Sequence, residues 1–251
     1  LDDINRDFPL ALDVGSHGGI LRRALAGSTK IGTLLECDLS PALAARARTS
    51  LAFAGDEEFL PVAAGSLDAI LAGPGLHWVN DLPGALIQMR RALKPDGLLL
   101  AALPGATTLA ELRQVLLSAE TELEGGARPR VSPFIELRDA GDLLQRAGFA
   151  LPVVDSEMLT VSYGNGLALM RDLRGMGETN GMDQRRKTFS RRATLFTAAE
   201  RYGELYGDAE GRIPATFQLI TLTAWAPDAS QPHSLRPGSA TARLGDALGT
   251  G

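Results

Sequence analysis

The sequence contains little that would crosslink the chain, hold it in a membrane or draw it to nucleic acid. It has a single cysteine, Cys37, in 251 residues, so no disulfide can form within the chain, and this usage is typical of a reducing compartment. No uninterrupted apolar run approaches the roughly 20 residues of a membrane-spanning helix. The net charge of −5 provides no general attraction to nucleic acid or to an anionic membrane surface. A hydrophobic fraction of 45% is ordinary for a soluble globular protein.

Seven short apolar stretches predict the strands of one sheet. Five of them alternate with helical stretches, which is typical of a parallel α/β sheet. These five are residues 10–14, 33–37, 51–54, 67–72 and 98–103. Residues 153–163 and 217–225 also have strand periodicity. The sequence therefore predicts an α/β, Rossmann-like fold: a seven-stranded, mostly parallel sheet with helices on both faces, in which 217–225 runs antiparallel to its neighbours.

Local signals predict where helices begin and where the chain turns. Ser40 and Asp81 are placed to cap the helices that follow them. Thr108 and Glu111 have the spacing of a capping box. Residues 93–97, Leu-Lys-Pro-Asp-Gly, form a strong turn signal between a helix and the fifth strand.

We expect four regions along the chain. Residues 1–163 form the Rossmann core, 164–213 a helical insertion or lid, 214–226 the last strand of the core sheet, and 227–251 an extended or disordered tail. The insertion contains a basic cluster, which is most often a solvated helix face and, in a lid, would alternatively receive an acidic partner. Its members are Arg185, Arg186, Lys187, Arg191 and Arg192.

Residues 10–20 have the pattern of a strand, a glycine-rich turn and a helix. Glycine tolerates positive φ and lets backbone N–H groups approach a ligand that a Cβ would block, although an ordinary tight turn has the same composition. Asp38 follows the turn by about 20 residues, where doubly wound folds place a carboxylate against ribose hydroxyls. The alternative for Asp38 is a helix-entry turn.

Two further segments follow later strands. Asp56 and Glu57, beside Phe59 and Leu60, are suited to border an adenine ring, and a solvated acidic loop is the alternative. We expect Glu58 to point to solvent. His77 and Trp78 follow the fourth strand, so they would border a ligand bound at this edge of the sheet; a loop-capping histidine and a core tryptophan are the alternative.

In their order and spacing these segments resemble the class I S-adenosylmethionine-dependent methyltransferases. The resemblance is carried by Asp13-Val14-Gly15, Gly19, Asp38, Asp56-Glu57 and the turn at 93–97. Other segments are similar to the mitochondrial complex I assembly-factor family of methyltransferase-like proteins and its bacterial homologues. These are residues 56–61, 76–81, 132–134, 175–178, 214–216 and 237–241.

The resemblance implies a function and a site. This family is described as using S-adenosyl-L-methionine to support hydroxylation of an arginine on a respiratory complex I subunit, and its bacterial members are usually labelled methyltransferases. A protein or small-molecule acceptor and a location in the bacterial cytoplasm or the mitochondrial matrix follow. We assign cofactor binding to Asp13, Gly15 and Gly19 (methionine end), Asp38 (ribose), Asp56 and Glu57 (adenine), Leu39 and Ala72, catalysis to His77 and Trp78, and no residue to a metal.

The sequence departs from the family at His17, where the family turn has glycine. A ring pointing into the pocket predicts weakened cofactor binding, whereas a ring pointing outward leaves binding intact. The hypotheses are therefore a methyltransferase, an arginine hydroxylase-like enzyme, a carboxyl methyltransferase of biotin synthesis, and an assembly protein without catalysis. Hydroxylation would call for an oxidant such as iron, for which His17, His77 and Asp13 are the available ligands, but they lack a tight ligand spacing.

Overall fold

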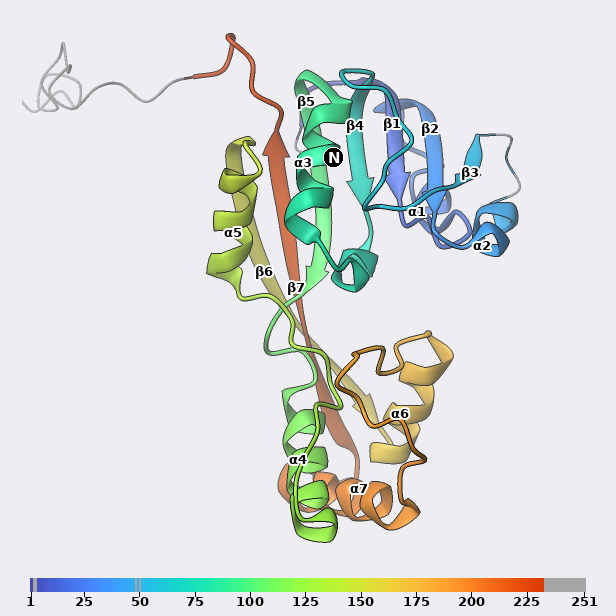
Figure 1. The fold of residues 1–251 in the computed structure, drawn as a ribbon, viewed down its shortest axis with the longest axis vertical. Coiled ribbons are helices and arrows are strands. Elements are labelled where there is room, and N and C mark those ends of the chain that lie inside the picture. Colours follow the sequence, from blue (N-terminus) through green and yellow to red (C-terminus); the bar gives the residue numbers. More distant parts are fainter. Residues whose placement is uncertain (2–3, 48, 50, 233–251) are drawn as a thin grey trace, which may run out of the picture.

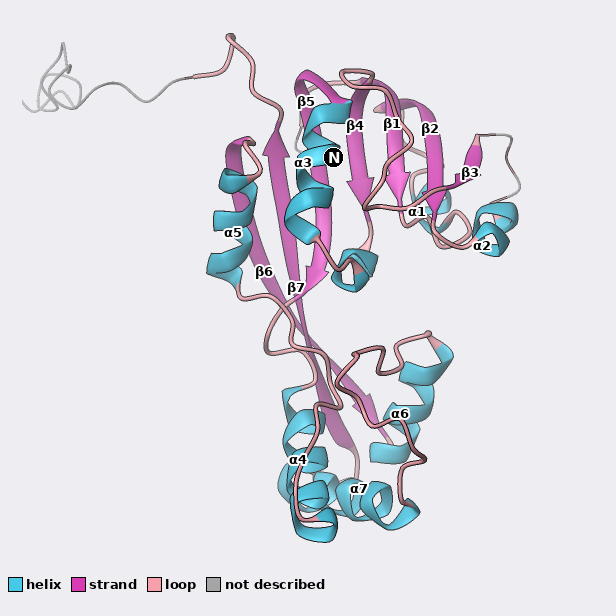
Figure 2. Cartoon of the chain, viewed as in Figure 1, coloured by secondary structure: helices cyan, strands magenta, loops and turns pink. Residues whose placement is uncertain are grey.

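The computed structural model of the chain describes residues 1, 4–47, 49 and 51–232, and it confirms the seven-stranded sheet (Figure 1, Figure 2). The strand order is β3-β2-β1-β4-β5-β7-β6, and β7 is antiparallel to both of its neighbours, as expected. The strands are β1 (Phe8–Val14), β2 (Ile31–Asp38), β3 (Ala52–Ala54), β4 (Leu67–Ala72), β5 (Leu93–Pro104), β6 (Ala150–Tyr163) and β7 (Ile213–Trp225).

Helices lie on both faces of this sheet because side chains alternate between the faces along each strand. Leu12 and Ile70 face α3 and α5 in the main hydrophobic cluster, whereas Ala11 and Ala69 belong to a smaller cluster on the opposite face, where α1 lies. The helices are α1 (Ile20–Ala24), α2 (Pro41–Arg46), the 3-10 helix η1 (Pro74–Trp78), α3 (Leu82–Ala92), α4 (Ala110–Glu124), α5 (Leu137–Arg146), α6 (Gly166–Gly175) and α7 (Arg192–Tyr206).

Two of the three predicted helix caps are confirmed. The Ser40 side chain accepts a hydrogen bond from the Leu43 N–H, and Asp81 accepts one from the Gly84 N–H. The capping box at Thr108 was wrong, since α4 is capped by Leu109 without a side-chain hydrogen bond. The Thr108 hydroxyl instead donates to the Gln218 carbonyl and accepts from the Gln218 N–H. Because it is bonded to β7, this hydroxyl is not available to cap α4.

The predicted turn at residues 93–97 lies inside β5. Leu93 already pairs with Leu67, the next pair is Leu98 with Ala69, and the extra residues form an irregularity in the strand. Asp96 has a φ of 59°, so the chain does bend there. Its N–H donates to the Ala226 carbonyl, which ties the bend to the end of β7 and keeps it within the sheet.

The start of the expected tail is packed. The Gln231 side chain is buried and donates to Asp96 Oδ1 and to the Ala226 carbonyl, both at 2.9 Å. These contacts hold the first part of the expected tail against β5 and the end of β7. Residues 233–251, including His233 and the segment 237–241, lie outside the described residues.

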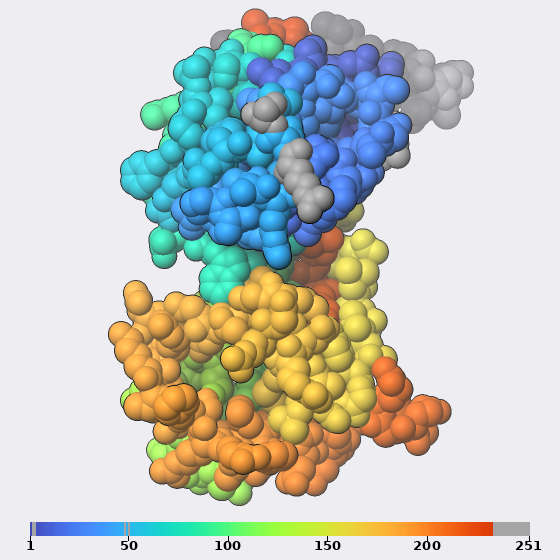
Figure 3. All heavy atoms as spheres, turned by 90° about the vertical axis from the view of Figure 1, so that its right-hand side faces the viewer, coloured from blue at the N-terminus to red at the C-terminus, as the bar shows by residue number. Residues whose placement is uncertain are grey.

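A second hydrophobic cluster lies where β6 and β7 extend beyond the other five strands. It joins α4, α6 and α7 to the ends of β6 and β7. We call this part the helical lobe and the rest of the chain the sheet lobe (Figure 1). In the space-filling view of Figure 3, the early blue-to-cyan segments and the yellow-to-orange segments form two bodies that meet at a waist. Helix α4, which precedes β6, thus packs with the helices of residues 164–213.

The buried hydroxyl of Tyr202 generates a stability prediction for the helical lobe. Tyr202 is fully buried, and its hydroxyl donates to the Pro214 carbonyl at 2.8 Å. Tyr202→Phe leaves that carbonyl without its donor, so we expect the free energy of unfolding in urea to fall by about 1–2 kcal/mol. Tyr206→Phe is the matched control, because its hydroxyl bonds to Gln114 in an exposed pair. Equal losses in the two variants would contradict this account.

Candidate functional site

The turn between β1 and α1 is held in a conformation that only a few residue types accept. Gly15, Gly18 and Gly19 have φ values of 71°, 71° and 79°, and His17 has a φ of 46°. A Cβ is strained in this left-handed region, so the glycines are needed for the chain to turn here. His17 is the one residue of this turn that adopts positive φ with a side chain.

Three N–H groups of the turn bind β2. Gly15 and Ser16 donate to the Cys37 carbonyl at 2.9 and 3.0 Å, and the His17 N–H donates to Asp38 Oδ2 at 2.9 Å. The parallel pairing of β1 with β2 thus continues into the turn and uses these three amides within the protein; the approach of turn amides to a ligand stays a prediction. The turn thereby holds the Asp38 carboxylate in place.

An acidic hollow of about 310 Å³ opens at the carboxyl ends of β1, β2 and β3. It brings together six residues that the sequence assigned to the site: Gly15, Asp38, Leu39, Asp56, Glu57 and Trp78. The structure adds His17, Glu58, Gly75, Val79 and Asn80 to its lining. Carboxylates from two segments, the end of β2 and the loop after β3, therefore face one small space. Burial of Glu57, followed by repulsion from Asp56 and Asp38, raises the pKa of the Glu57 carboxyl.

Asp13 lies beneath the turn rather than in the lining of this hollow. Its side chain is only 1% exposed, and its Oδ2 atom has no hydrogen-bond partner. Burial, followed by the charges of Glu36 and Asp38, raises the pKa of Asp13 to about 7. The Ser16 hydroxyl is also buried without a partner. Two polar groups next to the glycine turn thus retain unused hydrogen-bonding capacity.

Two other assigned residues lie away from the hollow. A Cβ on Gly19 would approach Glu36 Oε1 to 2.8 Å, so this glycine makes room for the ion pair between Arg22 and the buried Glu36. Ala72 ends β4 and lines a different, mostly apolar hollow on the α1 face of the sheet. Their assignment to cofactor binding stays a prediction.

The His17 ring reaches across the edge of the acidic hollow. Its Nε2 atom lies 3.0 Å from the position of a Cβ on Gly75 and 3.8 Å from that of a Cβ on Gly15. The ring therefore lies between the glycine turn and the start of η1. Of the two orientations considered from the sequence, the structure has the one directed into the site.

Glu58 does not point to solvent as expected. Its Oε1 accepts hydrogen bonds from the Asn80 N–H at 2.6 Å and from the Asp81 N–H at 3.4 Å. Its backbone carbonyl accepts one from the Gln88 side chain. The carboxylate thereby fixes the loop between η1 and α3, a contact between segments 22 residues apart that no local pattern signals.

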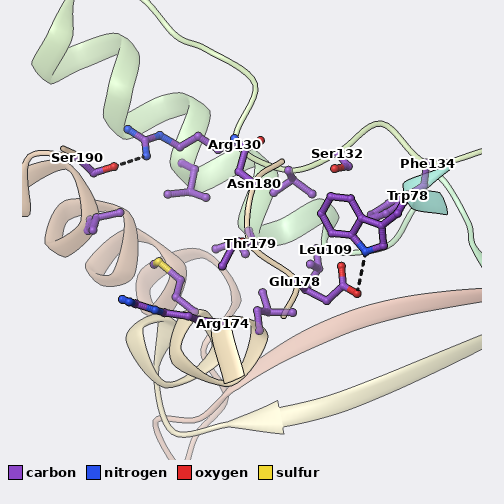
Figure 4. Close-up of a pocket in the computed structure, with 16 residues that line it drawn as sticks. Trp78, Leu109, Arg130, Ser132, Phe134, Arg174, Glu178, Thr179, Asn180 and Ser190 are labelled. Carbon is purple, nitrogen blue, oxygen red and sulfur yellow. Dashed lines mark hydrogen bonds between the residues drawn. The ribbon is translucent and has the colours of Figure 1, made fainter. Parts of the chain in front are cut away.

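His77 and Trp78 lie at the end of η1, where they meet Glu178 from the helical lobe. His77 Nε2 is 3.1 Å from Glu178 Oε2, and the Trp78 indole N–H donates to Glu178 Oε1 at 3.4 Å (Figure 4). His77 Nδ1 faces the Pro74 carbonyl at 2.5 Å. The hydrogen bond from His77 is the largest of the effects that lower the pKa of Glu178. Sequence reasoning singled out the motif at 175–178 but assigned Glu178 no role.

A second hollow of about 370 Å³ adjoins this contact, and we call it the leucine hollow (Figure 4). Its floor consists of Leu109, Leu112, Leu116, Met170, Leu173 and Leu195, and its polar rim includes Arg130, Arg174, Glu178 and Asn180. Trp78 lines both hollows. The indole is therefore the wall that separates the acidic hollow from the leucine hollow.

The basic cluster of the insertion is partly tied to the protein itself. Arg186 forms an ion pair with Glu124, Arg185 donates to the Met182 carbonyl, and Arg192 lies over the Phe196 ring. A role for the cluster in receiving an acidic partner stays a prediction.

In the described part of the chain, no three His, Cys, Asp or Glu side chains are grouped so that they could hold a metal ion, so His17, His77 and Asp13 do not form such a group. Among the helices that the structure describes, none has the length and apolar character needed to cross a membrane.

Comparison with known proteins places this chain in a family. Residues 12–101 match the family described as a methyltransferase domain. Among solved structures, the YcgJ protein of Bacillus subtilis has the same fold, with a TM-score of 0.58 at 16% identity over 89% of this chain and 94% of that one. The phosphoethanolamine N-methyltransferase 2 of Haemonchus contortus, in complex with S-adenosyl-L-methionine, has a TM-score of 0.52 at 16% identity, covering 90% of this chain and 50% of that one.

Relatives of known name match almost the whole chain. The mitochondrial arginine hydroxylase NDUFAF5 of Rattus norvegicus is 43% identical over 97% of this chain and 72% of its own length, and that of Homo sapiens is 42% identical over 97% and 71%. A malonyl-[acyl-carrier protein] O-methyltransferase of Xylella fastidiosa is 40% identical over 69% of this chain and 56% of its own length. The chain therefore belongs to the methyltransferase-like family that includes the NDUFAF5 arginine hydroxylases.

Proposed function

We propose that the chain binds S-adenosyl-L-methionine in the acidic hollow and uses it to modify an acceptor that approaches past Trp78. The observation that carries the proposal is the meeting of Asp38, Asp56 and Glu57 with the glycine turn at one edge of the sheet. Membership of a methyltransferase-like family supports it, as does the S-adenosyl-L-methionine held by a structural neighbour of the same fold.

The residues present fit such a cofactor. Asp38 accepts backbone hydrogen bonds from His17 and Ser40, one on each oxygen, which leaves lone pairs for two ribose hydroxyls. The unpartnered Oδ2 of Asp13 and hydroxyl of Ser16 supply hydrogen-bonding capacity near the methionine end. The cofactor carries a sulfonium and an ammonium group, and the surrounding carboxylates favour these positive charges.

Methyl transfer requires the protein to align the acceptor with the methyl group, and it does not require acid–base groups. The bound cofactor supplies a methyl group that is already activated toward a nucleophile. What remains for this chain is to hold the acceptor in line and to exclude water. His77 and Trp78 border the passage between the two hollows, so they are the residues that would position the acceptor.

The acceptor we propose is an arginine side chain of a protein, with a respiratory complex I subunit as the partner that the family resemblance implies. The location would then be the mitochondrial matrix or the bacterial cytoplasm. The names of the NDUFAF5 relatives favour a second candidate reaction in place of methyl transfer: hydroxylation of that arginine, a two-electron oxidation that consumes an oxidant such as dioxygen as the source of the oxygen atom. The two reactions leave different products.

Mass spectrometry separates the two reactions. The chain is incubated with a complex I subunit and S-adenosylmethionine carrying a deuterated methyl group. Methyl transfer adds about 14 Da, or about 17 Da with the deuterated methyl, whereas hydroxylation adds about 16 Da with either cofactor. We expect the methyl label on arginine. An increase of about 16 Da that does not respond to deuterium would establish hydroxylation instead.

Cofactor affinity should depend on pH through Asp13. The pKa of this buried carboxyl is raised to about 7, so Asp13 is largely neutral below that pH and becomes an anion as the pH rises through it. An anion attracts the cationic cofactor, so calorimetry should show affinity for S-adenosyl-L-methionine rising several-fold between about pH 6 and pH 8. Asp13→Asn should flatten this dependence. A variant that keeps the wild-type slope would assign it to another group, for which Glu57→Gln is the comparison.

Removing the His17 ring should strengthen cofactor binding. The ring takes up space at the edge of the acidic hollow, and His17 has positive φ, which glycine accepts without strain. We expect His17→Gly to raise the affinity for S-adenosylhomocysteine several-fold in a calorimetric titration. His17→Ala removes the ring but keeps the strained Cβ, so it separates the two causes. Wild-type affinity in both variants would show that the ring does not obstruct the site.

A further inference from the structure

Glu178 has a position that the proposed function does not explain. It follows α6 in the helical lobe, yet both of its carboxylate oxygens contact η1 of the sheet lobe, through His77 and Trp78. Its side chain is 38% exposed, so a ligand can reach it. It is also the single carboxylate among the residues that line the leucine hollow.

We propose that Glu178 is the specificity-determining carboxylate for the acceptor, and that it selects a planar guanidinium group over neutral groups of the same shape. The inference rests on the proposed function, because it concerns the acceptor side of the same site. It adds the residue that recognises the acceptor and the chemistry by which it does so.

The contacts of Glu178 show what kind of partner it accepts. The Pro74 carbonyl and the Glu178 carboxylate face the two nitrogens of the His77 ring, and both are hydrogen-bond acceptors. The planar ring therefore meets the carboxylate edge-on through Nε2. Glu178 thus contacts a ring nitrogen of His77 with one oxygen and accepts the Trp78 indole N–H with the other.

A guanidinium group presents two N–H donors along one edge of its plane, one for each oxygen of a carboxylate. Its two N–H donors are parallel and match the two oxygens of a carboxylate, and this pairing is stronger and more selective than a single charged contact. The His77 and Trp78 donors therefore occupy the place where an acceptor arginine would bind. Binding of that arginine replaces the internal contact with a bidentate one.

The surroundings of Glu178 suit the rest of an arginine side chain. Trp78 and Phe134 line the hollow on this side, and aromatic faces stabilise a guanidinium by cation–π contact. The leucine floor can receive the aliphatic stem. The Arg130 guanidinium is held by Glu120 and Ser190, and Figure 4 shows Arg130 and Arg174 away from the Glu178 carboxylate, toward the other end of the hollow. Because its pKa is lowered, Glu178 carries its negative charge at neutral pH.

The Trp78 indole N–H provides a direct readout, because the chain contains only two tryptophans. The peptide Ac-Gly-Arg-Gly-NH2 is titrated into the full chain, and the two indole signals are followed by NMR, with Trp225→Phe to assign them. We expect the Trp78 signal to shift and the Trp225 signal to stay. The matching citrulline peptide, which has the same shape without the charge, should bind at least about tenfold more weakly.

Variants test the role of Glu178 itself. Glu178→Gln removes the charge at constant size and should weaken binding of the arginine peptide at least about tenfold. Asp183→Asn is the control, since it makes the same change on an exposed carboxylate of the same segment. Equal affinity for the arginine and citrulline peptides, or an unchanged affinity in Glu178→Gln, would overturn the inference.

A parallel titration with S-adenosylhomocysteine keeps this outcome distinct from the proposed function. We expect the wild type and Glu178→Gln to bind S-adenosylhomocysteine equally. Cofactor binding without discrimination between the peptides overturns the role of Glu178 alone. Absence of cofactor binding in the wild type overturns the proposed function.

Discussion

The site depends on the left-handed backbone of the turn after β1. Because Gly15 adopts positive φ, the chain can bend back and place the N–H groups of Gly15 and Ser16 on the Cys37 carbonyl. The next N–H, that of His17, then holds Asp38. The end of β2, the carboxylate that faces the acidic hollow and the direction of α1 all follow from this one bend. A Cβ at these glycines would strain every one of those contacts.

The two hollows differ in what they offer a ligand, and the indole of Trp78 lies between them. The acidic hollow concentrates carboxylates, of which Glu57 already has a raised pKa, so it favours a compact positive ligand. The leucine hollow has a large apolar floor and the one carboxylate of Glu178. Neither lobe forms this arrangement alone, because η1 comes from the sheet lobe and Glu178 from the helical lobe. Because Trp78 lines both hollows, a ligand in the acidic hollow and a ligand in the leucine hollow can contact the same side chain.

Features set by neighbours in the chain were predictable from the sequence. The glycine turn, the caps at Ser40 and Asp81 and the antiparallel last strand all depend on short-range signals or on apolar periodicity. The errors come from partners far away: the Gln218 backbone takes the Thr108 hydroxyl, and Glu58 binds a loop instead of pointing to water. The contact of His77 with Glu178 joins residues 101 positions apart in the chain. The motif at 175–178 could therefore be recognised in the sequence, but the contact that Glu178 makes could not be predicted.

The long ribbon of β6 and β7 determines how the lobes can move. The two strands stay paired without a shift from Val153 to Tyr163, about 35 Å at the usual rise per residue, and they end inside both hydrophobic clusters. Before Leu219, where β7 does not pair with β5, the two strands form a two-stranded ribbon. It resists stretching, because lengthening it would break backbone hydrogen bonds, whereas two-stranded ribbons take up a larger twist than wider sheets. We therefore expect the ribbon to permit rotation of one lobe relative to the other. The lobes would rotate about its axis while their separation stays constant, and the passage beside Trp78 would open by rotation.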